Sequence, residues 1–270
     1  KHRDVGPVVI DIDMKFIPEF HKKDDGDDII NEKGEKVPKL ERKYNEDLVK
    51  KIVEIYSDEI AKTFQLPNMA KVTALIFERK QPYFHKGEVK DGIHVVYPYI
   101  ISEPNVQYLI REKVIKRASE EDIFSEIPLK KKIYSEIFDR KVIHANGWFM
   151  YGSSKPYFSS YELTHIYDMN LDEVAKNELD YESHTNLAKF LSIRRFYHHD
   201  CTKVKSEIQD GIDKIVKKQK AHTQNSMKKK KPSNNNYDVK VVSRLVNCLD
   251  IWRAENWEPW IELGWCLHNI

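Results

Sequence analysis

The sequence predicts a domain that mixes strands with helices, in the α/β or α+β class, and three features of the chain point to it. A β-branched segment, Val8–Ile12, lies near the N-terminus, and two more strand-like segments follow before residue 100. Apolar residues at helical spacing occupy the stretches between and after them. Strands interleaved with helices are typical of these two classes. At 270 residues the chain is long enough for one large or two small cores.

Each element is expected from its own pattern. In chain order we expect a strand at Val8–Ile12, a polar surface excursion or hairpin at 20–44, a helix at Glu46–Phe64, strands at Val72–Arg79 and Ile93–Tyr97, a helix at Asn105–Arg117, a mixed apolar segment at Lys141–Tyr151 and mostly helix at Leu171–Ile193. Between the two later strands, Lys86-Gly87 and Asp91-Gly92 are expected to be turns, because glycine adopts positive φ readily.

Composition divides the chain into three parts. Residues 1–200 carry the alternating strands and helices, residues 201–240 read as a Lys- and Asn-rich tether that is partly helical, and residues 241–270 begin a further helical module. The chain starts without methionine and stops inside a helical pattern. We therefore expect it to be a piece of a larger protein.

Charge and cysteine content narrow the partners and the compartment. The chain has 45 Lys and Arg against 43 Asp and Glu, so its net charge of +2 indicates no particular partner. Lysines nevertheless cluster in 214–231, where they suit a solvated linker or a weak attraction for single-stranded DNA. Three widely spaced cysteines fit a reducing compartment. With no signal peptide and no apolar run of spanning length, we expect no membrane partner.

The first candidate site is the acidic pair Asp11 and Asp13. Side chains at i and i+2 share one face of a strand, so the two carboxylates point together. They repel each other unless a cation lies between them, and oxygen ligands of this kind suit a divalent metal of nucleotide chemistry. The alternative is a strand terminus with capping aspartates.

Two further segments carry candidate binding residues. Lys90 and His94 flank a glycine and suit a cradle for phosphate oxygens, although a lone strand histidine is more often structural. Downstream, Gly152–Lys155 offers small residues whose amides can face an anion, with a lysine beside them, although many surface turns look alike. Between them lies Asp139, which also fits a turn or a helix end.

Together these segments resemble the archaeo-eukaryotic primase superfamily, in particular the helicase–primases of nucleocytoplasmic large DNA viruses of poxvirus, asfarvirus and mimivirus type. The family's motifs are matched, in order, by the Asp-x-Asp of Asp11 and Asp13, the small-x-His of Gly92 to His94, the apolar-Asp of Phe138-Asp139 and the viral Trp-x-x-Tyr-Gly-Ser-x-Lys-Pro segment at 148–156. The tail 253–267 is similar to the helical module that joins such primases to a superfamily-3 ATPase.

The resemblance implies a fold and a set of site residues. It implies an α+β primase catalytic core, with an α/β metal-bearing sheet plus an RRM-like sheet, and a C-terminal helical extension. Two Mg²⁺ or Mn²⁺ ions would be held by Asp11, Asp13 and Asp139, of which the third is the least constrained because Glu136 is near. The phosphates of an NTP or dNTP would be held by Lys90, His94, Ser153, Ser154 and Lys155.

The implied function is DNA primase activity, a nucleotidyl transfer that builds primers on a single-stranded DNA template. The implied partners are that template, contacted by Arg194 and Arg195, and a covalently linked superfamily-3 helicase. The cytoplasmic replication site of an infected cell is the expected location. Alternatives are a primase-polymerase that mainly extends primers, a DNA-binding platform that loads the helicase, and, more weakly, a metal-dependent nuclease. Zinc binding by His198, His199 and Cys201 is a further, less favoured option.

Overall fold

A computed structural model describes residues 4–66, 72–149, 151–155, 158–179, 184–193, 201–229, 239–250, 252–256 and 261–262. The chain divides into two compact units, Lys1–Lys218 and Gln219–Ile270. The first unit combines helices with an antiparallel sheet, which confirms the mixed class and favours α+β over α/β. No helix in the described part of the chain is long and apolar enough to cross a membrane.

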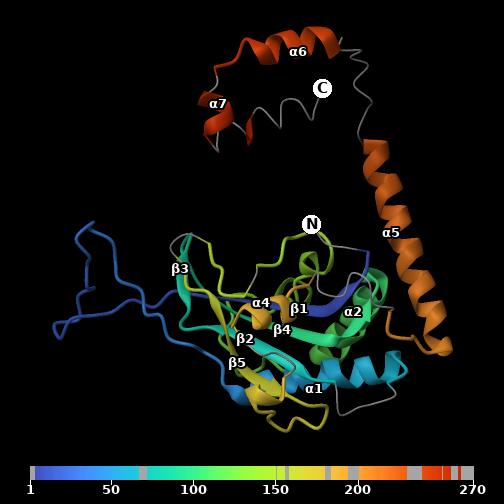
Figure 1. Ribbon diagram of the computed structural model, residues 1–270. Helices are drawn as coiled ribbons and strands as arrows, with labels where there is room; N and C mark the ends of the chain where they lie inside the picture. The colour runs from blue at the N-terminus through green and yellow to red at the C-terminus, as the bar shows by residue number, and fades with distance from the viewer. Residues whose placement is uncertain are drawn as a thin grey trace. The chain divides into compact units, whose positions relative to one another are not determined.

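The elements follow one another as strands and helices in alternation (Figure 1). The first unit contains β1 (Gly6–Phe16), α1 (Glu46–Thr63), β2 (Ala74–Arg79), β3 (Tyr83–His85), β4 (Glu88–Ser102), α2 (Pro104–Glu120), α3 (Tyr134–Ile137), β5 (Tyr161–Tyr167), α4 (His184–Phe190) and the start of α5 (Gln209–Lys229). Short 3-10 helices lie at Lys141–Ile143, Lys176–Glu178 and Ser206–Ile208. The second unit contains the rest of α5, α6 (Val239–Asn247) and α7 (Trp252–Glu255).

The described strands form one five-stranded sheet in the order β1-β4-β2-β5, with β3 also paired to β4. Every pairing is antiparallel. Here the structure differs from the expected pair of sheets, because β1, with the first acidic motif, pairs directly along β4, with the histidine motif. The RRM-like sheet is therefore not confirmed.

Alternating side chains place apolar residues on both faces of the sheet. On one face Ile10, Ile12 and Ile93 pack with the apolar sides of α1 and α2. This core also takes in Ile212 and Ile215 of α5, so the compact unit continues past residue 200, where the composition changes. On the other face a smaller core forms around one half of the sheet, built from Val9, Leu75, Phe77, Val96, Leu163, Ile166, Leu187, Phe190 and Leu191 among others. The rest of that face is left for polar side chains.

One expected turn is confirmed and the other is wrong. Lys86 and Gly87 have φ values of 53° and 76° and join β3 to β4, as a two-residue hairpin turn requires. Asp91 and Gly92 instead lie inside β4. A buried aspartate is tolerated there because its carboxylate accepts hydrogen bonds from the Arg42 Nε at 3.0 Å and its neighbour's amide at 2.9 Å.

Two later segments also differ from expectation. β5 was not predicted, and the described residues of Leu171–Ile193 are helical only in short pieces, Lys176–Glu178 and α4. The reason for the second difference is local. The Asp168 carboxylate accepts hydrogen bonds from the amides of Asn170 and Asp172, which closes a turn where the apolar spacing suggested a helix.

The polar excursion is present as an arm, residues 20–41, that leaves the sheet between β1 and α1 (Figure 1). It is folded on itself by short bridges, such as Phe20 to Pro38 and Ile30 to Lys36. The arm ends at Arg42, whose guanidinium donates to the Glu78 carboxylate at 3.0 Å and to the backbone carbonyl of Arg79. Arg42 therefore fixes the end of the arm to the ends of β2 and β4.

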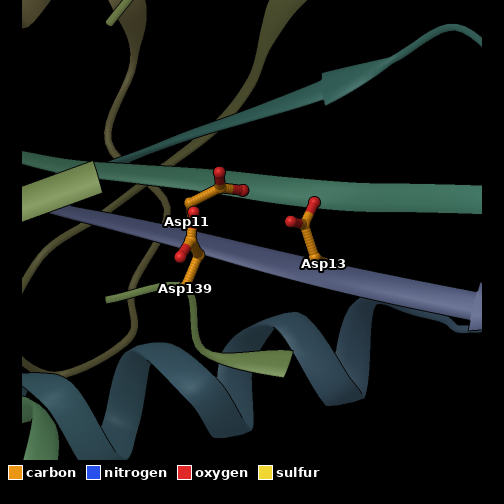
Figure 2. Close-up of side chains that lie close together, drawn as sticks. All are labelled: Asp11, Asp13 and Asp139. Atoms are coloured by element: carbon orange, nitrogen blue, oxygen red, sulfur yellow. The ribbon is translucent and has the colours of Figure 1, made fainter. Parts of the chain in front are cut away.

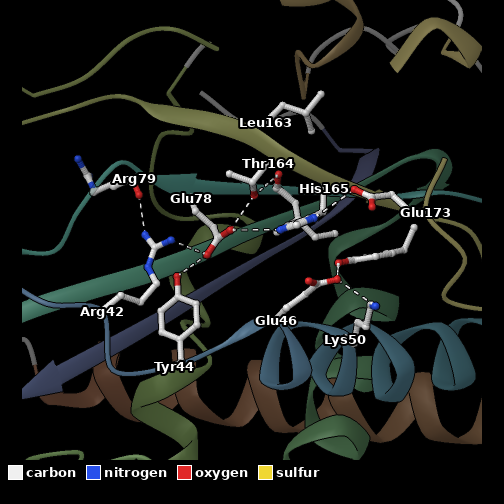
Figure 3. A network of polar contacts seen from close by, with 12 residues as sticks. Arg42, Tyr44, Glu46, Lys50, Glu78, Arg79, Leu163, Thr164, His165 and Glu173 are labelled. Carbon is white, nitrogen blue, oxygen red and sulfur yellow. Dashed lines mark hydrogen bonds and ion pairs between the residues drawn. The ribbon is translucent and has the colours of Figure 1, made fainter. Parts of the chain in front are cut away.

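Several side chains form hydrogen bonds or ion pairs with the Glu78 carboxylate (Figure 3). Besides Arg42, the Tyr44 hydroxyl and the Thr164 hydroxyl each donate to it at 2.8 Å. Glu78 and Asp91 are 5% and 2% exposed, so two carboxylates are buried around one guanidinium. Burial raises the pKa of Asp91, and the hydrogen bond and charge of Arg42 oppose that rise. Arg42 supplies the compensating charge for both acids.

Replacing Arg42 with alanine should lower the free energy of unfolding substantially, because it leaves Glu78 and Asp91 buried without their cation. Removing one partner of a fully buried ion pair costs roughly 3–5 kcal/mol. The expected loss lies at or below this range, since the Arg42 side chain is 28% exposed and solvent screens its charge. Urea unfolding measures it. The deficit should shrink as the pH falls, because protonation neutralises the orphaned acids. Lys43→Ala, whose partners Glu19 and Glu41 are exposed, is the matched control and should leave the midpoint unchanged.

Candidate metal and nucleotide site

The register of β1 against β4 builds one wall of the site. Asp11 pairs with His94, Asp13 with Gly92, and Lys15 with Lys90. Paired residues of antiparallel strands place their side chains on the same face, so the two acids, the histidine and the two lysines share one face of the sheet. This is the face opposite α1 and α2. Lys90 thus lies in the same strand as His94, and not on the upstream loop expected from the sequence.

Asp139 joins these acids from a distant part of the chain. Phe138 forms a bridge with Ile12, and the Asp139 amide donates to the Asp11 carbonyl at 2.9 Å. Arg111 secures this segment from behind, because its Nε donates to the Phe138 carbonyl at 2.8 Å. The segment therefore runs along the outer edge of β1. The expectation that Asp139 reaches the first two acids is met in this geometry.

The three carboxylates converge, as Figure 2 shows. One oxygen from each of Asp11, Asp13 and Asp139 lies within 4.8 Å of the others. The Asp11 Oδ1 atom is buried without a hydrogen-bond partner, and the His94 Nε2 atom lies 3.4 Å from it. A buried carboxylate oxygen left without a donor is costly unless a cation fills its place. Oxygen donors at this spacing fit Mg²⁺ or Mn²⁺.

The electrostatics of the three acids agree with a cation site. Burial, followed by the charges of Asp13 and Asp139, raises the pKa of Asp11 well above its usual value. Partial burial and the charge of Asp139 likewise raise the pKa of Asp13. Carboxylates that repel one another at short range destabilise the charged state of the site. A bound divalent cation would remove that penalty, so the three aspartates fit a divalent metal ion.

His94 is held as a neutral ring. Its imidazole is stacked on Tyr161, with ring centroids 3.6 Å apart at 19°, and lies 4.5 Å from the Trp148 ring. Burial, together with the nearby charge of Arg79, lowers the pKa of His94 to about 3. The ring therefore contributes directional hydrogen bonding and no positive charge at neutral pH.

Gly92 is required by the same stack of rings. A Cβ atom at this position would lie 2.8 Å from the Ile12 carbonyl oxygen and 3.0 Å from the Tyr161 hydroxyl. The missing side chain therefore lets Tyr161 lie across β4 and reach His94. This is a physical reason for the small residue in the small-x-His motif.

A cavity of about 300 Å³ opens over these residues. It is lined by the three acids together with His94, Lys15, Lys90, Lys155 and Arg79 and by several aromatic and small residues. Ser153 lines a smaller neighbouring cavity with Trp148 and Tyr161, and Ser154 is exposed and lines neither. Carboxylates that could bind metal ions and basic side chains that could bind phosphates thus line the same cavity. Arg194, Arg195, His198 and His199 lie outside the described residues, and Cys201 is exposed.

Arg79 is a site residue that sequence reasoning missed. Its guanidinium lies 4.3 Å from the centre of the Tyr161 ring and donates to the Ser159 carbonyl. Its Nε atom is buried without a hydrogen-bond partner. The charge of Arg79 lowers the pKa of Asp11, so the two side chains are close. Arg79 lies two residues beyond Phe77 and therefore on the same face of β2, and Phe77 pairs with His94. This spacing could have pointed to Arg79, but only once β2 is known to pair with β4.

Comparison with known proteins identifies the family. A family model described as "C962R protein N-terminal AEP domain" matches residues 1–167. The chain belongs to this AEP domain family. AEP stands for archaeo-eukaryotic primase, so the resemblance read from the sequence motifs is confirmed. Membership of this primase superfamily indicates a nucleotidyltransferase-type enzyme.

A full-length viral protein is also similar to this AEP domain. The chain is 29% identical over 295 residues to the protein described as "Putative helicase L207/L206" of Acanthamoeba polyphaga mimivirus. The match covers 100% of this chain and 28% of the mimivirus protein. The chain therefore spans about a quarter of the relative's length.

Proposed function

We propose that this AEP domain synthesises primers on single-stranded DNA by template-directed nucleotidyl transfer from nucleoside triphosphates. In this reaction the 3′-hydroxyl of an acceptor nucleotide attacks the α-phosphate of the incoming triphosphate, a phosphodiester forms and pyrophosphate leaves. The single observation that carries the proposal is the meeting of Asp11, Asp13 and Asp139 beside a cationic cavity. In-line displacement of this kind depends on positioning and charge stabilisation, which such a site supplies.

The three aspartates would hold two Mg²⁺ or Mn²⁺ ions. When bound, such ions lower the pKa of an attacking hydroxyl and neutralise the developing charge on the phosphates. Backbone groups orient Asp139, because its amide donates to the β1 backbone and its carboxylate accepts a hydrogen bond from the Lys141 amide at 2.9 Å. Their geometry is therefore set by the fold before any ligand arrives.

The cations of the cavity would bind the triphosphate. Lys90 and Lys155 bring mobile ammonium groups, and Arg79 brings a guanidinium oriented by its aromatic neighbours. The neutral His94 ring would donate a hydrogen bond to a phosphate oxygen. These groups argue against a simple nuclease, because a nuclease has no triphosphate to hold.

The remaining partners follow from the proposed reaction. We expect a single-stranded template, with Arg194 and Arg195 as candidate contacts, and a helicase linked further along the chain, as the mimivirus relative's printed name suggests for that protein. Replication in the cytoplasm of an infected cell remains part of the proposal.

The test is an assay on the domain with single-stranded template, Mn²⁺ and labelled nucleoside triphosphates. We expect dinucleotides and short primers without any annealed primer, and no product from Asp13→Asn. Extension of an annealed primer alone would favour the primase-polymerase alternative. Template binding without any synthesis would favour the helicase-loading platform, and shortening of the template would favour a nuclease.

A further inference from the structure

Besides the small cavity that Ser153 lines, a second cavity adjoins the metal site and shares Asp13 with it. It has a volume of about 140 Å³ and is lined by Asp13, Lys15, Glu88, Lys130, Lys131, Glu136 and Ile137. Asp13 and Lys15 line the larger cavity as well, so these two residues separate the two spaces. The second cavity is smaller than the usual range for a whole small-molecule ligand, and its size suits one part of a nucleotide.

The wall of this cavity is fixed to the end of β1. Leu129 forms a bridge with Phe16, and the Lys130 amide donates to the Lys15 carbonyl at 2.8 Å. The Lys130 ammonium pairs with Glu88 at 2.9 Å, which ties the same loop to the start of β4. The loop that carries the lysines is therefore held against the strand that carries Asp13.

Two of the three lysines at the cavity have their charge available. In the described part of the chain Lys15 and Lys131 are exposed and form no ion pair, whereas Lys130 pairs with Glu88. Lys132, the next residue along the loop, pairs with Asp122 and does not line the cavity. The cavity is also lined by three carboxylates, of which Glu88 pairs with Lys130, Glu136 is exposed, and Asp13 feels the charge of Lys15. With Asp13 holding a metal ion, the ammonium groups of Lys15 and Lys131 would suit an anion that lies next to the metals.

We infer that this second cavity binds a phosphate of the acceptor nucleotide, the nucleotide whose 3′-hydroxyl attacks. The inference rests on the proposed function. The incoming triphosphate has its own cations, Arg79, Lys90 and Lys155, in the larger cavity. Asp13 lies between the two spaces, so a nucleotide held by Lys15 and Lys131 has its sugar beside the metals and opposite the incoming α-phosphate. That arrangement meets the in-line requirement of phosphoryl transfer.

The same phosphate chemistry has two sources. During extension the group is the phosphodiester next to the 3′ end of the primer. During initiation it is the 5′-triphosphate of the first nucleotide. The experiment separates these sources, because the acceptor concentration is varied once as annealed primer and once as free initiating nucleotide.

Lys131→Ala tests the inference, with Lys132→Ala as the matched control from the same loop. In Mn²⁺, Lys131→Ala should raise the KM for primed template roughly tenfold, as expected for one lost charge-assisted phosphate contact, and leave the KM for the incoming nucleotide unchanged. The salt dependence of primer binding should also weaken. Lys132→Ala should match the wild type. A rise in KM for the initiating nucleotide as well would assign both sources to the cavity.

A binding measurement keeps this test separate from the test of the proposed function. Fluorescence anisotropy with a dideoxy-terminated primer on its template requires no catalysis. If the wild type synthesises nothing but Lys131→Ala still binds this primed template about tenfold more weakly than Lys132→Ala, the cavity binds the strand and only the proposed reaction fails. Equal binding of the primed template by both variants would overturn the inference, whatever the activity.

Discussion

Replacing Asp11 with asparagine should abolish nucleotidyl transfer and, at the same time, make the metal-free domain more stable. The carboxylate proposed to hold the metals lies close to those of Asp13 and Asp139, and its Oδ1 atom is buried without a hydrogen-bond partner. Asparagine keeps the shape and removes the charge. We expect kcat to fall by about 10³ or more, since a charge at the reacting phosphates is lost.

The gain in stability follows from the same charges. Because burial and two neighbouring carboxylates raise the pKa of Asp11, its ionised form opposes folding at neutral pH. In EDTA the variant should gain about 0.5–2 kcal/mol in unfolding free energy, the usual range for a single stabilising substitution. Mn²⁺ should stabilise the wild type in thermal melts and stabilise the variant much less.

The control for this experiment is Asp24→Asn, an exposed acid of the arm at residues 20–41, which should change neither property. Two results would contradict the interpretation. One is an active Asp11→Asn enzyme. The other is a variant that is less stable than the wild type in EDTA, because the three acids would then be held together by contacts that need the negative charge.

Replacing Arg79 with alanine should have the next largest effect, a fall of about 10²–10³ in kcat/KM for the incoming nucleotide. The guanidinium is fixed over Tyr161 and its buried Nε lacks a partner, so a phosphate oxygen is the expected acceptor. The effect should fall on the incoming nucleotide and not on the template, which steady-state kinetics with each substrate varied in turn will separate.

Two further variants make the Arg79 result specific. Arg79→Lys keeps a charge but loses the planar fork, so its activity should lie between those of alanine and the wild type. Lys80→Ala removes the exposed cation next along the chain and should behave as the wild type. Equal losses in Arg79→Ala and Lys80→Ala would point to a general effect of net charge and would overturn the assigned role.

The acidic site could be predicted from the sequence more accurately than the sheet could. Asp11 and Asp13 were predictable because a strand's period of two is a local property. Asp139 was found through the family resemblance, since nothing local distinguishes it from a turn residue. The Lys86-Gly87 turn was predictable as well, because its two positive φ angles depend only on local sterics.

The errors came from contacts between distant residues. Asp91-Gly92 has the composition of a turn, and only the ion-pair partner Arg42 and the overlying Tyr161 make it part of a strand. Arg79 was missed for the same reason, since its place over Tyr161 depends on the pairing of β2 with β5. Tertiary contacts outweighed local preference at both positions.

Because β1 pairs directly with β4, these two strands should not tolerate an inserted or deleted residue, whereas the arm at residues 20–41 should. An inserted or deleted residue in Val8–Phe16 or Val89–Val96 would reverse which side chains face the cavity, because strand side chains alternate. Metal ligands and phosphate ligands would then turn together into the apolar core. The arm at residues 20–41 is outside this ladder, so its length is free to vary, provided that the chain returns to Arg42.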